Sequence, residues 1–156
     1  MKYTIISLLV LVFGSIYLNL ILSQDLTRQK PIEKTILFKG ENGNLHFYEP
    51  SELGFKTGKL YKLILKNKSN SKHYFSSIQF SKAIFTRKIQ ILSNGKKLAE
   101  IKGIIDEVEI WPNHQIEWWF VPIKTGYFKD LFCKVKDKKT GKSHADMGMR
   151  GTILIE

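Results

Sequence analysis

The sequence contains a single cysteine, Cys133, among its 156 residues. One cysteine cannot form a disulfide within the chain, which excludes a disulfide-stapled scaffold. A lone cysteine is either a small buried apolar side chain or a thiol with a function, such as binding a metal. The residues that surround Cys133 favour the second interpretation.

The sequence also lacks internal repeats and low-complexity tracts, which excludes a repeat architecture. It contains no recognisable hydrolytic triad and no paired acid and base, so the patterns that usually identify an enzyme are missing. We therefore predict that the protein is not an enzyme.

Charged residues are nearly absent from the first 24 positions, where Lys2 precedes an apolar run over Tyr3–Leu22. A charged start, an apolar stretch and a polar exit are typical of an export signal. The run is close to the roughly 20 residues that span a bilayer, and Leu22-Ser23-Gln24 is a poor cleavage site. Residues 1–24 are thus predicted to be a signal peptide or an N-terminal membrane anchor helix, with the remainder periplasmic or otherwise extracytoplasmic.

The rest of the chain reads as a short linker and one domain. Residues 25–34 are polar, contain Pro31 and are expected to tether the domain, and residues 35–156 suffice for one hydrophobic core. Acidic residues are scarce. Without Lys2 the chain has 24 Lys and Arg residues against 14 Asp and Glu residues, so its formal net charge is +10. This surface favours anionic partners, and export makes nucleic acid the least expected of them.

Strand patterns dominate the domain. Segments rich in β-branched and aromatic residues alternate between apolar and polar positions and are separated by Gly, Pro and Asn, as in half-buried strands. The predicted strands are Leu60–Lys66, Glu107–Trp111, Gln115–Val121, Tyr127–Cys133 and Thr152–Glu156.

Turn and helix signals complete this picture. Pro112-Asn113 predicts a tight hairpin between two of the strands, and Thr125-Gly126 predicts a turn into the strand that ends at Cys133. Ser76–Phe85 has no strand alternation and predicts one short helix. The sum is an all-β fold, a Greek-key sandwich or barrel of about seven or eight strands.

Soft metal ligands gather between the last two predicted strands. This loop begins at Cys133 and contains His144, Met147 and Met149. A thiolate, an imidazole and a thioether suit copper, and a histidine from another strand end would complete a His₂Cys set. His73, which follows the Leu60–Lys66 strand, can supply it. Zinc is the main rival, but zinc sites rarely use methionine.

These residues carry a resemblance to a known family. The stretch from Gly126-Tyr127-Phe128 through Cys133, followed by SHADMGMRGTILI, resembles the C-terminal copper loop of cupredoxins such as plastocyanin, pseudoazurin and the copper domain of nitrite reductase. The shared pattern is an aromatic strand ending in Cys, then His-x-x-x-Gly-Met-x-Gly and an apolar strand. Upstream, KLYKLILKNKSNSKHYF is similar to the segment that supplies the first histidine. The resemblance covers about Leu60–Glu156.

The resemblance implies one copper ion in a cupredoxin-like sandwich, with no catalytic residue and no other cofactor. The implied metal ligands are His73, Cys133, His144 and Met149. In this set the thioether of Met149 is the weak axial ligand, and Met147 competes for that place. His46 and His114 are expected to be surface histidines.

The sequence departs from the family pattern in two ways. Ten residues separate Cys133 from His144, more than in the familiar electron-transfer members. The strand Gly126–Cys133 also holds one extra residue, which places Lys129 on the same face as Cys133 unless a β-bulge resets the register.

Three functions remain open at this stage. The favoured one is a type 1-like carrier of single electrons; the others are a copper delivery or storage module and a metal-free interaction domain in which Cys133 is merely buried. The loop after Cys133 is rich in lysine and predicts docking of an acidic redox partner. Its lysines are Lys134, Lys136, Lys138, Lys139 and Lys142.

Overall fold

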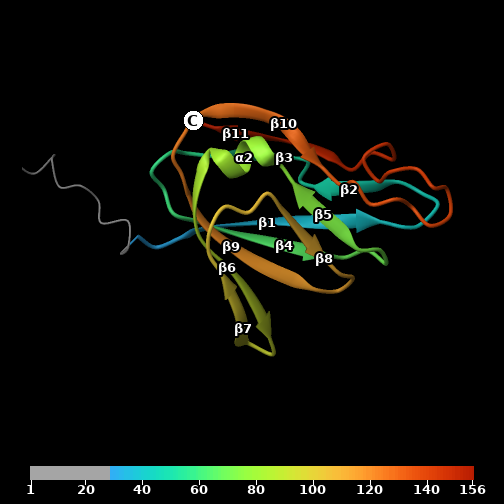
Figure 1. Cartoon of the computed structure of the whole chain (residues 1–156), viewed down its shortest axis with the longest axis horizontal. Coiled ribbons are helices and arrows are strands. Elements are labelled where there is room, and N and C mark those ends of the chain that lie inside the picture. The colour runs from blue at the N-terminus through green and yellow to red at the C-terminus, as the bar shows by residue number, and fades with distance from the viewer. Residues whose placement is uncertain (1–28) are drawn as a thin grey trace, which may run out of the picture.

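The computed structural model describes residues 29–156, so the predicted export segment lies outside the described residues. Those residues form eleven strands and one short helix, α2 (Ile78–Lys82), arranged as an all-β sandwich (Figure 1). The helix lies within the predicted range Ser76–Phe85 and ends early because Ile84 begins a strand. No helix within this part of the chain is long and apolar enough to cross a membrane.

The first sheet has six strands in the order β2-β1-β4-β9-β6-β7. Their bounds are β1 (Ile32–Gly40), β2 (His46–Glu49), β4 (Tyr61–Asn67), β6 (Ile84–Ser93), β7 (Lys96–Ile101) and β9 (Gln115–Pro122). β1 runs parallel to β4, and the other neighbours are antiparallel. The β6–β7 hairpin projects from the body of the sandwich (Figure 1), and every residue of β7 is exposed.

The second sheet has five strands in the order β3-β11-β10-β5-β8. Their bounds are β3 (Glu52–Phe55), β5 (His73–Ser76), β8 (Glu107–Ile110), β10 (Gly126–Phe132) and β11 (Arg150–Ile155). The pairing of β10 with β11 shifts register between Phe128 and Leu131. Lys129 is consequently exposed while Leu131 and Cys133 are buried, which confirms the β-bulge that the extra residue required.

The turn at Pro112-Asn113 does not close a hairpin, so that prediction was wrong. β8 pairs with β5 in the second sheet, whereas β9 pairs with β4 and β6 in the first. The turn instead carries the chain from one layer to the other, and the N–H of Asn113 donates to the carbonyl of Asn67. Alternation identified both strands correctly but carries no information on which neighbour each one pairs with.

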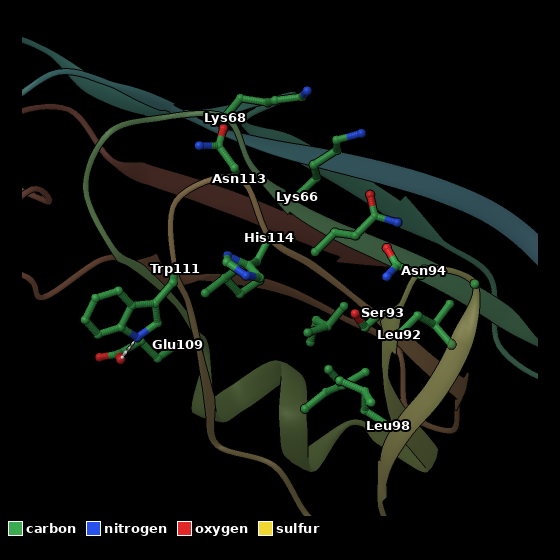
Figure 2. A pocket seen from close by; sticks show the side chains of 15 residues that line it. Lys66, Lys68, Leu92, Ser93, Asn94, Leu98, Glu109, Trp111, Asn113 and His114 are labelled. Carbon is green, nitrogen blue, oxygen red and sulfur yellow. Dashed lines mark hydrogen bonds between the residues drawn. The ribbon is translucent and has the colours of Figure 1, made fainter.

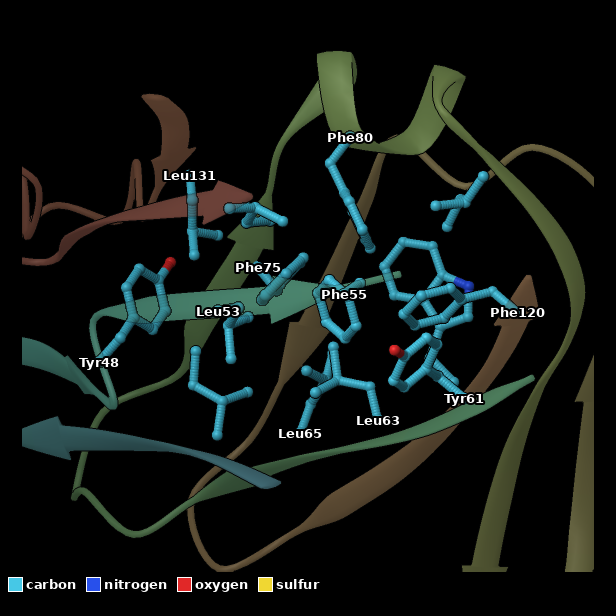
Figure 3. Packing of buried hydrophobic residues seen from close by; sticks show 14 of the residues in the cluster. Tyr48, Leu53, Phe55, Tyr61, Leu63, Leu65, Phe75, Phe80, Phe120 and Leu131 are labelled. Atoms are coloured by element: carbon cyan, nitrogen blue, oxygen red, sulfur yellow. The ribbon is translucent and has the colours of Figure 1, made fainter. Parts of the chain in front are cut away.

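Aromatic side chains fill the space between the sheets. Phe80 reaches from α2 into the centre of the core (Figure 3), where its ring packs against Phe55, Phe75, Trp118 and Phe120 at centroid distances of 5.3–6.2 Å. Burying one such side chain contributes roughly 1.5–3 kcal/mol to stability. The core thus forms a rigid frame for the loops at the end of the sandwich.

Candidate metal centre

The side chains of His73, Cys133 and His144 meet at one end of the sandwich, and none has exposed surface. His73 begins β5, Cys133 follows β10, and His144 lies in the loop before β11. Nδ1 of His73 lies 3.0 Å from Nδ1 of His144. Sγ of Cys133 lies 3.7 Å from the first nitrogen and 3.6 Å from the second. His73 is therefore brought together with Cys133 and His144, two predicted site residues that lie 60 and 71 positions later in the chain.

These separations suit donors that share one ion. In zinc sites the metal lies about 2.0–2.1 Å from nitrogen and about 2.3 Å from sulfur, so donors around one ion lie roughly 3.3–3.8 Å apart. The three distances between the donor atoms of His73, Cys133 and His144 are within a few tenths of an ångström of that range. A thiolate and two imidazoles in this arrangement fit copper or zinc.

A buried hydrogen-bonded loop orients His73. Nε2 of His73 lies 2.7 Å from the hydroxyl oxygen of Ser69, so its Nδ1 faces the cluster. Asn67 holds that loop, because its Oδ1 accepts from the N–H and the hydroxyl of Ser69. Its Nδ2 donates to the carbonyls of Ser71 and Ile110. Such outer partners fix which imidazole nitrogen is free to bind a metal.

Burial keeps both imidazoles neutral. Burial and the neighbouring His144 and His46 lower the pKa of His73 to about 3, and burial and His46 lower the pKa of His144 to about 4. Burial raises the pKa of the Cys133 thiol, although the backbone N–H of Tyr74 donates to Sγ at 3.3 Å. At neutral pH the imidazoles offer lone pairs, and a metal that binds Cys133 must displace the thiol proton.

The two candidate methionines lie in different surroundings. Met149 has no exposed surface. Its backbone is hydrogen-bonded to two residues of the cluster: its N–H donates to the carbonyl of His144, and its carbonyl accepts from the N–H of Cys133. Met147 is partly exposed, and its sulfur accepts a hydrogen bond from the hydroxyl of Thr140 at 3.4 Å. The backbone of Met149 is thus hydrogen-bonded to His144 and Cys133, whereas the sulfur of Met147 contacts Thr140.

His46 is fully buried, so the prediction of a surface histidine was wrong. It begins β2, and its ring stacks on the ring of His144 with centroids 3.7 Å apart and planes 18° apart. Ligand nitrogens of His46, His73 and His144 all lie within 4.8 Å of one another. No spacing pattern links position 46 to the C-terminal loop. His114, by contrast, is exposed as expected.

The ring of His46 lies beside the predicted metal ligands because it stacks on the ring of His144. The lone pair of an imidazole nitrogen lies in the ring plane, and the planes of His46 and His144 are nearly parallel. The residues that would hold an ion together with Nδ1 of His144 are therefore His73 and Cys133, whose donor atoms lie 3.0 and 3.6 Å from it. The other side of His46 faces Asp137, with Nε2 3.3 Å from a carboxylate oxygen.

Asp137 is a buried carboxylate within the lysine-rich loop. Burial alone would raise its pKa, but the N–H groups of Gly43 and Thr140, the His46 ring and the Thr140 hydroxyl hydrogen-bond to its oxygens and lower the pKa well below its usual range. Asp137 is therefore ionised at neutral pH, and Nε2–H of His46 donates to it. From the sequence, Asp137 could be recognised only as the one acidic residue that partly balances the charge of the surrounding lysines.

A separate cavity of about 840 Å³ lies beside the β6–β7 hairpin (Figure 2). Its lining includes Trp111, whose Nε1 donates to Glu109, and His114. Ile110 also lines it and is the cross-strand partner of His73. None of the four predicted metal ligands is among its lining residues, so the cavity is not an entrance to the cluster.

No protein-family model and no curated protein matches the chain. Solved structures do match. A multicopper oxidase from Campylobacter jejuni has a TM-score of 0.55 and 19% identity, with 81% of this chain and 30% of that chain covered. A blue copper oxidase from Nitrosomonas europaea has a TM-score of 0.54 and 18% identity, with 85% and 46% covered. A copper-containing nitrite reductase from Thermus scotoductus has a TM-score of 0.57 and 12% identity, with 85% and 32% covered.

The chain spans less than half the length of each of these three structures, so the likeness is to one part of a larger protein. At these identities a match in structure establishes the fold. In this chain the fold is a sandwich of two mixed β-sheets with one short helix among the described residues. Residues 29–156 have a cupredoxin-like fold.

Proposed function

We propose that the protein is an exported mononuclear copper protein that carries single electrons. The observation that carries this proposal is the convergence of the Cys133 thiol with Nδ1 of His73 and of His144 in a buried, preformed cluster. With Met149 as the axial ligand, the set offers two sulfurs and two imidazole nitrogens, a combination that selects copper over zinc. Copper bound there supplies a one-electron couple, and the rigid donors limit rearrangement between its oxidation states.

Two further observations support a carrier without enzymatic activity. The three cluster side chains have no exposed surface, so within residues 29–156 a substrate has no direct access from solvent to their donor atoms. The cavity beside the β6–β7 hairpin does not include them. The similar solved structures are copper oxidases and a copper nitrite reductase, which supports copper as the metal while their own catalysis belongs to longer chains.

Loading the full chain with Cu(II) and recording visible and paramagnetic resonance spectra tests this proposal. A carrier is expected to bind one copper, show an intense thiolate-to-copper band and cycle reversibly at a stable potential. Rapid transfer of Cu(I) to an acceptor would instead favour a delivery or storage module. Failure to bind copper would leave a metal-free interaction domain.

We also propose that the domain functions in the periplasm or another extracytoplasmic space, with residues 1–24 as a cleaved signal or a retained anchor. The apolar run over Tyr3–Leu22 supports this location. Cell fractionation and N-terminal sequencing of the mature protein test it. A full-length chain in the cytosolic fraction would contradict it.

The axial position can be tested with a pair of leucine variants. Met149→Leu is expected to retain copper and to raise its reduction potential, because removing a weak sulfur donor destabilises Cu(II) more than Cu(I). Met147→Leu is the matched control and should leave the potential unchanged, since the sulfur of Met147 contacts Thr140. Voltammetry of both variants measures the effect. A shift in Met147→Leu alone would assign the axial role to the other sulfur.

We further propose that the lysine-rich loop docks an acidic redox partner. Lys136, Lys138 and Lys139 are exposed on the loop that contains His144. Replacing these three by Gln is expected to slow electron transfer from an acidic donor and to flatten its dependence on ionic strength, because rim charges act mainly on association. The potential should change little, since exposed charges are screened within about 10 Å at 0.1 M salt.

Stopped-flow rates with an acidic and a neutral donor, across ionic strength, measure this effect. The matched control replaces three exposed lysines near the opposite ends of the strands. These are Lys56, Lys59 and Lys124. Equal salt slopes for the two triple variants would show that the loop has no special role in docking.

A further inference from the structure

We propose that His46, anchored by Asp137, is a positioning residue that fixes the ring of His144 and thereby slows the loss of bound copper. The inference rests on the proposed function and deepens it, because retention of the metal distinguishes a carrier from a delivery module.

The two histidines of the cluster are held in different ways. Nε2 of His73 lies 2.7 Å from the hydroxyl of Ser69, which fixes that ring from behind. Nε2 of His144 is buried and has no hydrogen-bond partner among residues 29–156. The ring of His144 therefore lacks the outer hydrogen bond that usually orients a metal-binding imidazole. The ring of His46, stacked on it at 3.7 Å, takes the place of that bond.

Asp137 in turn fixes His46. One carboxylate oxygen lies 3.3 Å from Nε2 of His46 and also accepts from the N–H of Gly43 at 2.8 Å. The other accepts from the N–H groups of Lys139 and Thr140 at 3.0 and 2.7 Å. Because these donors come from the β1–β2 connection and from the lysine-rich loop, Asp137 joins the two segments around His46.

The backbone on both sides leaves His46 little room to move. Its N–H donates to the carbonyl of Met147, within the loop that holds His144. A Cβ at Gly40 would lie 2.6 Å from Nδ1 of His46, and a Cβ at Gly148 would lie 2.7 Å from a methyl carbon of Leu45. Both glycines have positive φ, of 133° and 109°. His144 is thus covered by a tightly packed group, which must move before that ring can swing away from a metal.

Two substitutions separate the ring of His46 from its hydrogen bond. His46→Gln keeps an N–H donor for Asp137 but removes the stacked ring, and His46→Phe keeps a ring but removes the donor. With Cu(I)-loaded full chain and excess chelator, His46→Gln is expected to lose copper about 10- to 100-fold faster than the parent, the usual range for an outer partner of a metal ligand. His46→Phe, which keeps the ring but loses the anchor, should lose copper about tenfold faster than the parent and more slowly than His46→Gln. His114→Phe, at an exposed histidine, is the matched control and should not change the rate.

A measurement on the metal-free protein makes the test independent of copper. The ring protons of His144 are shielded by the stacked ring of His46, so His46→Gln should shift their NMR signals and His46→Phe should largely preserve them. Unchanged signals and an unchanged chelator rate in His46→Gln would overturn the inference. If the parent bound no copper, the proposed function would fail while the NMR comparison still decided whether His46 positions His144.

The inference also stays falsifiable if His46→Gln does not fold. Asp137→Asn leaves both rings in place and weakens only the anchor, and it is expected to speed copper loss about tenfold. Asp106→Asn, at an exposed aspartate, is its control. Equal rates for the two asparagine variants would show that Asp137 does not act through His46.

Discussion

Cys133→Ser is expected to abolish the intense thiolate-to-copper absorption of the loaded protein while leaving the sandwich folded. The colour depends on the Cu–S bond, and a serine hydroxyl offers no such bond. Cys133 lies at the end of β10, away from the aromatic contacts around Phe80 that dominate the core. Burying a hydroxyl in its place costs about 1–3 kcal/mol, too little to unfold an ordinary domain.

Visible absorption, paramagnetic resonance and thermal melting of the copper-loaded and metal-free variant measure this result. Met147→Leu serves as a control for a sulfur lost from the same loop. An unchanged visible band in Cys133→Ser would exclude Cys133 as a copper ligand. A lost band together with a lost fold would show instead that the cysteine is structural.

Asn67→Ala is expected to reduce the free energy of unfolding by at least about 2 kcal/mol, because a buried group left without its hydrogen bond costs about 1–3 kcal/mol. The substitution removes the Asn67 amide from the Ser71 and Ile110 carbonyls and from the Ser69 N–H, and leaves the Ser71 carbonyl with the Ser69 hydroxyl. It also removes the Asn67 contacts that help to hold Ser69, which orients His73. Copper affinity should therefore fall about 10- to 100-fold as well.

Urea denaturation and competition with a copper chelator measure the two effects separately. Asn70→Ala is the matched control, since Asn70 is exposed on the same loop. Equal stability of the two variants would contradict the structural role of Asn67. A destabilised Asn67→Ala that bound copper as tightly as the parent would show that Ser69 does not orient His73 for the metal.

The cluster was predictable from sequence where its residues share one short segment. Cys133, His144 and Met149 lie between two recognisable strands, and the soft character of their donors was enough to suggest copper. The extra residue in the strand that ends at Cys133 was also informative. Regular alternation would place Lys129 on the same face as Cys133, so a β-bulge is needed for Lys129 to face solvent. The two-residue period of a strand was therefore enough to predict the β-bulge.

The remainder depended on contacts that no local pattern encodes. His46 and Asp137 meet 91 positions apart, and the stacking of His46 on His144 follows from how β2 packs against the loop. β7 was not predicted because all its residues are exposed, which removes the apolar alternation that identifies a strand. The turn at Pro112-Asn113 was misassigned because pairing partners are set by the whole sandwich.

The span of the cluster along the chain has a consequence for the order of folding. Nδ1 of His73 and Nδ1 of His144 meet across 71 positions, and β11 pairs in parallel with β3, which lies 100 positions earlier in the chain. Contacts of such long range form late, because closing long loops costs entropy before any contact compensates for it. The donor atoms therefore converge only when both sheets have closed. Copper added during refolding should leave the rate of folding unchanged and slow only the rate of unfolding, since the site is absent from the transition state.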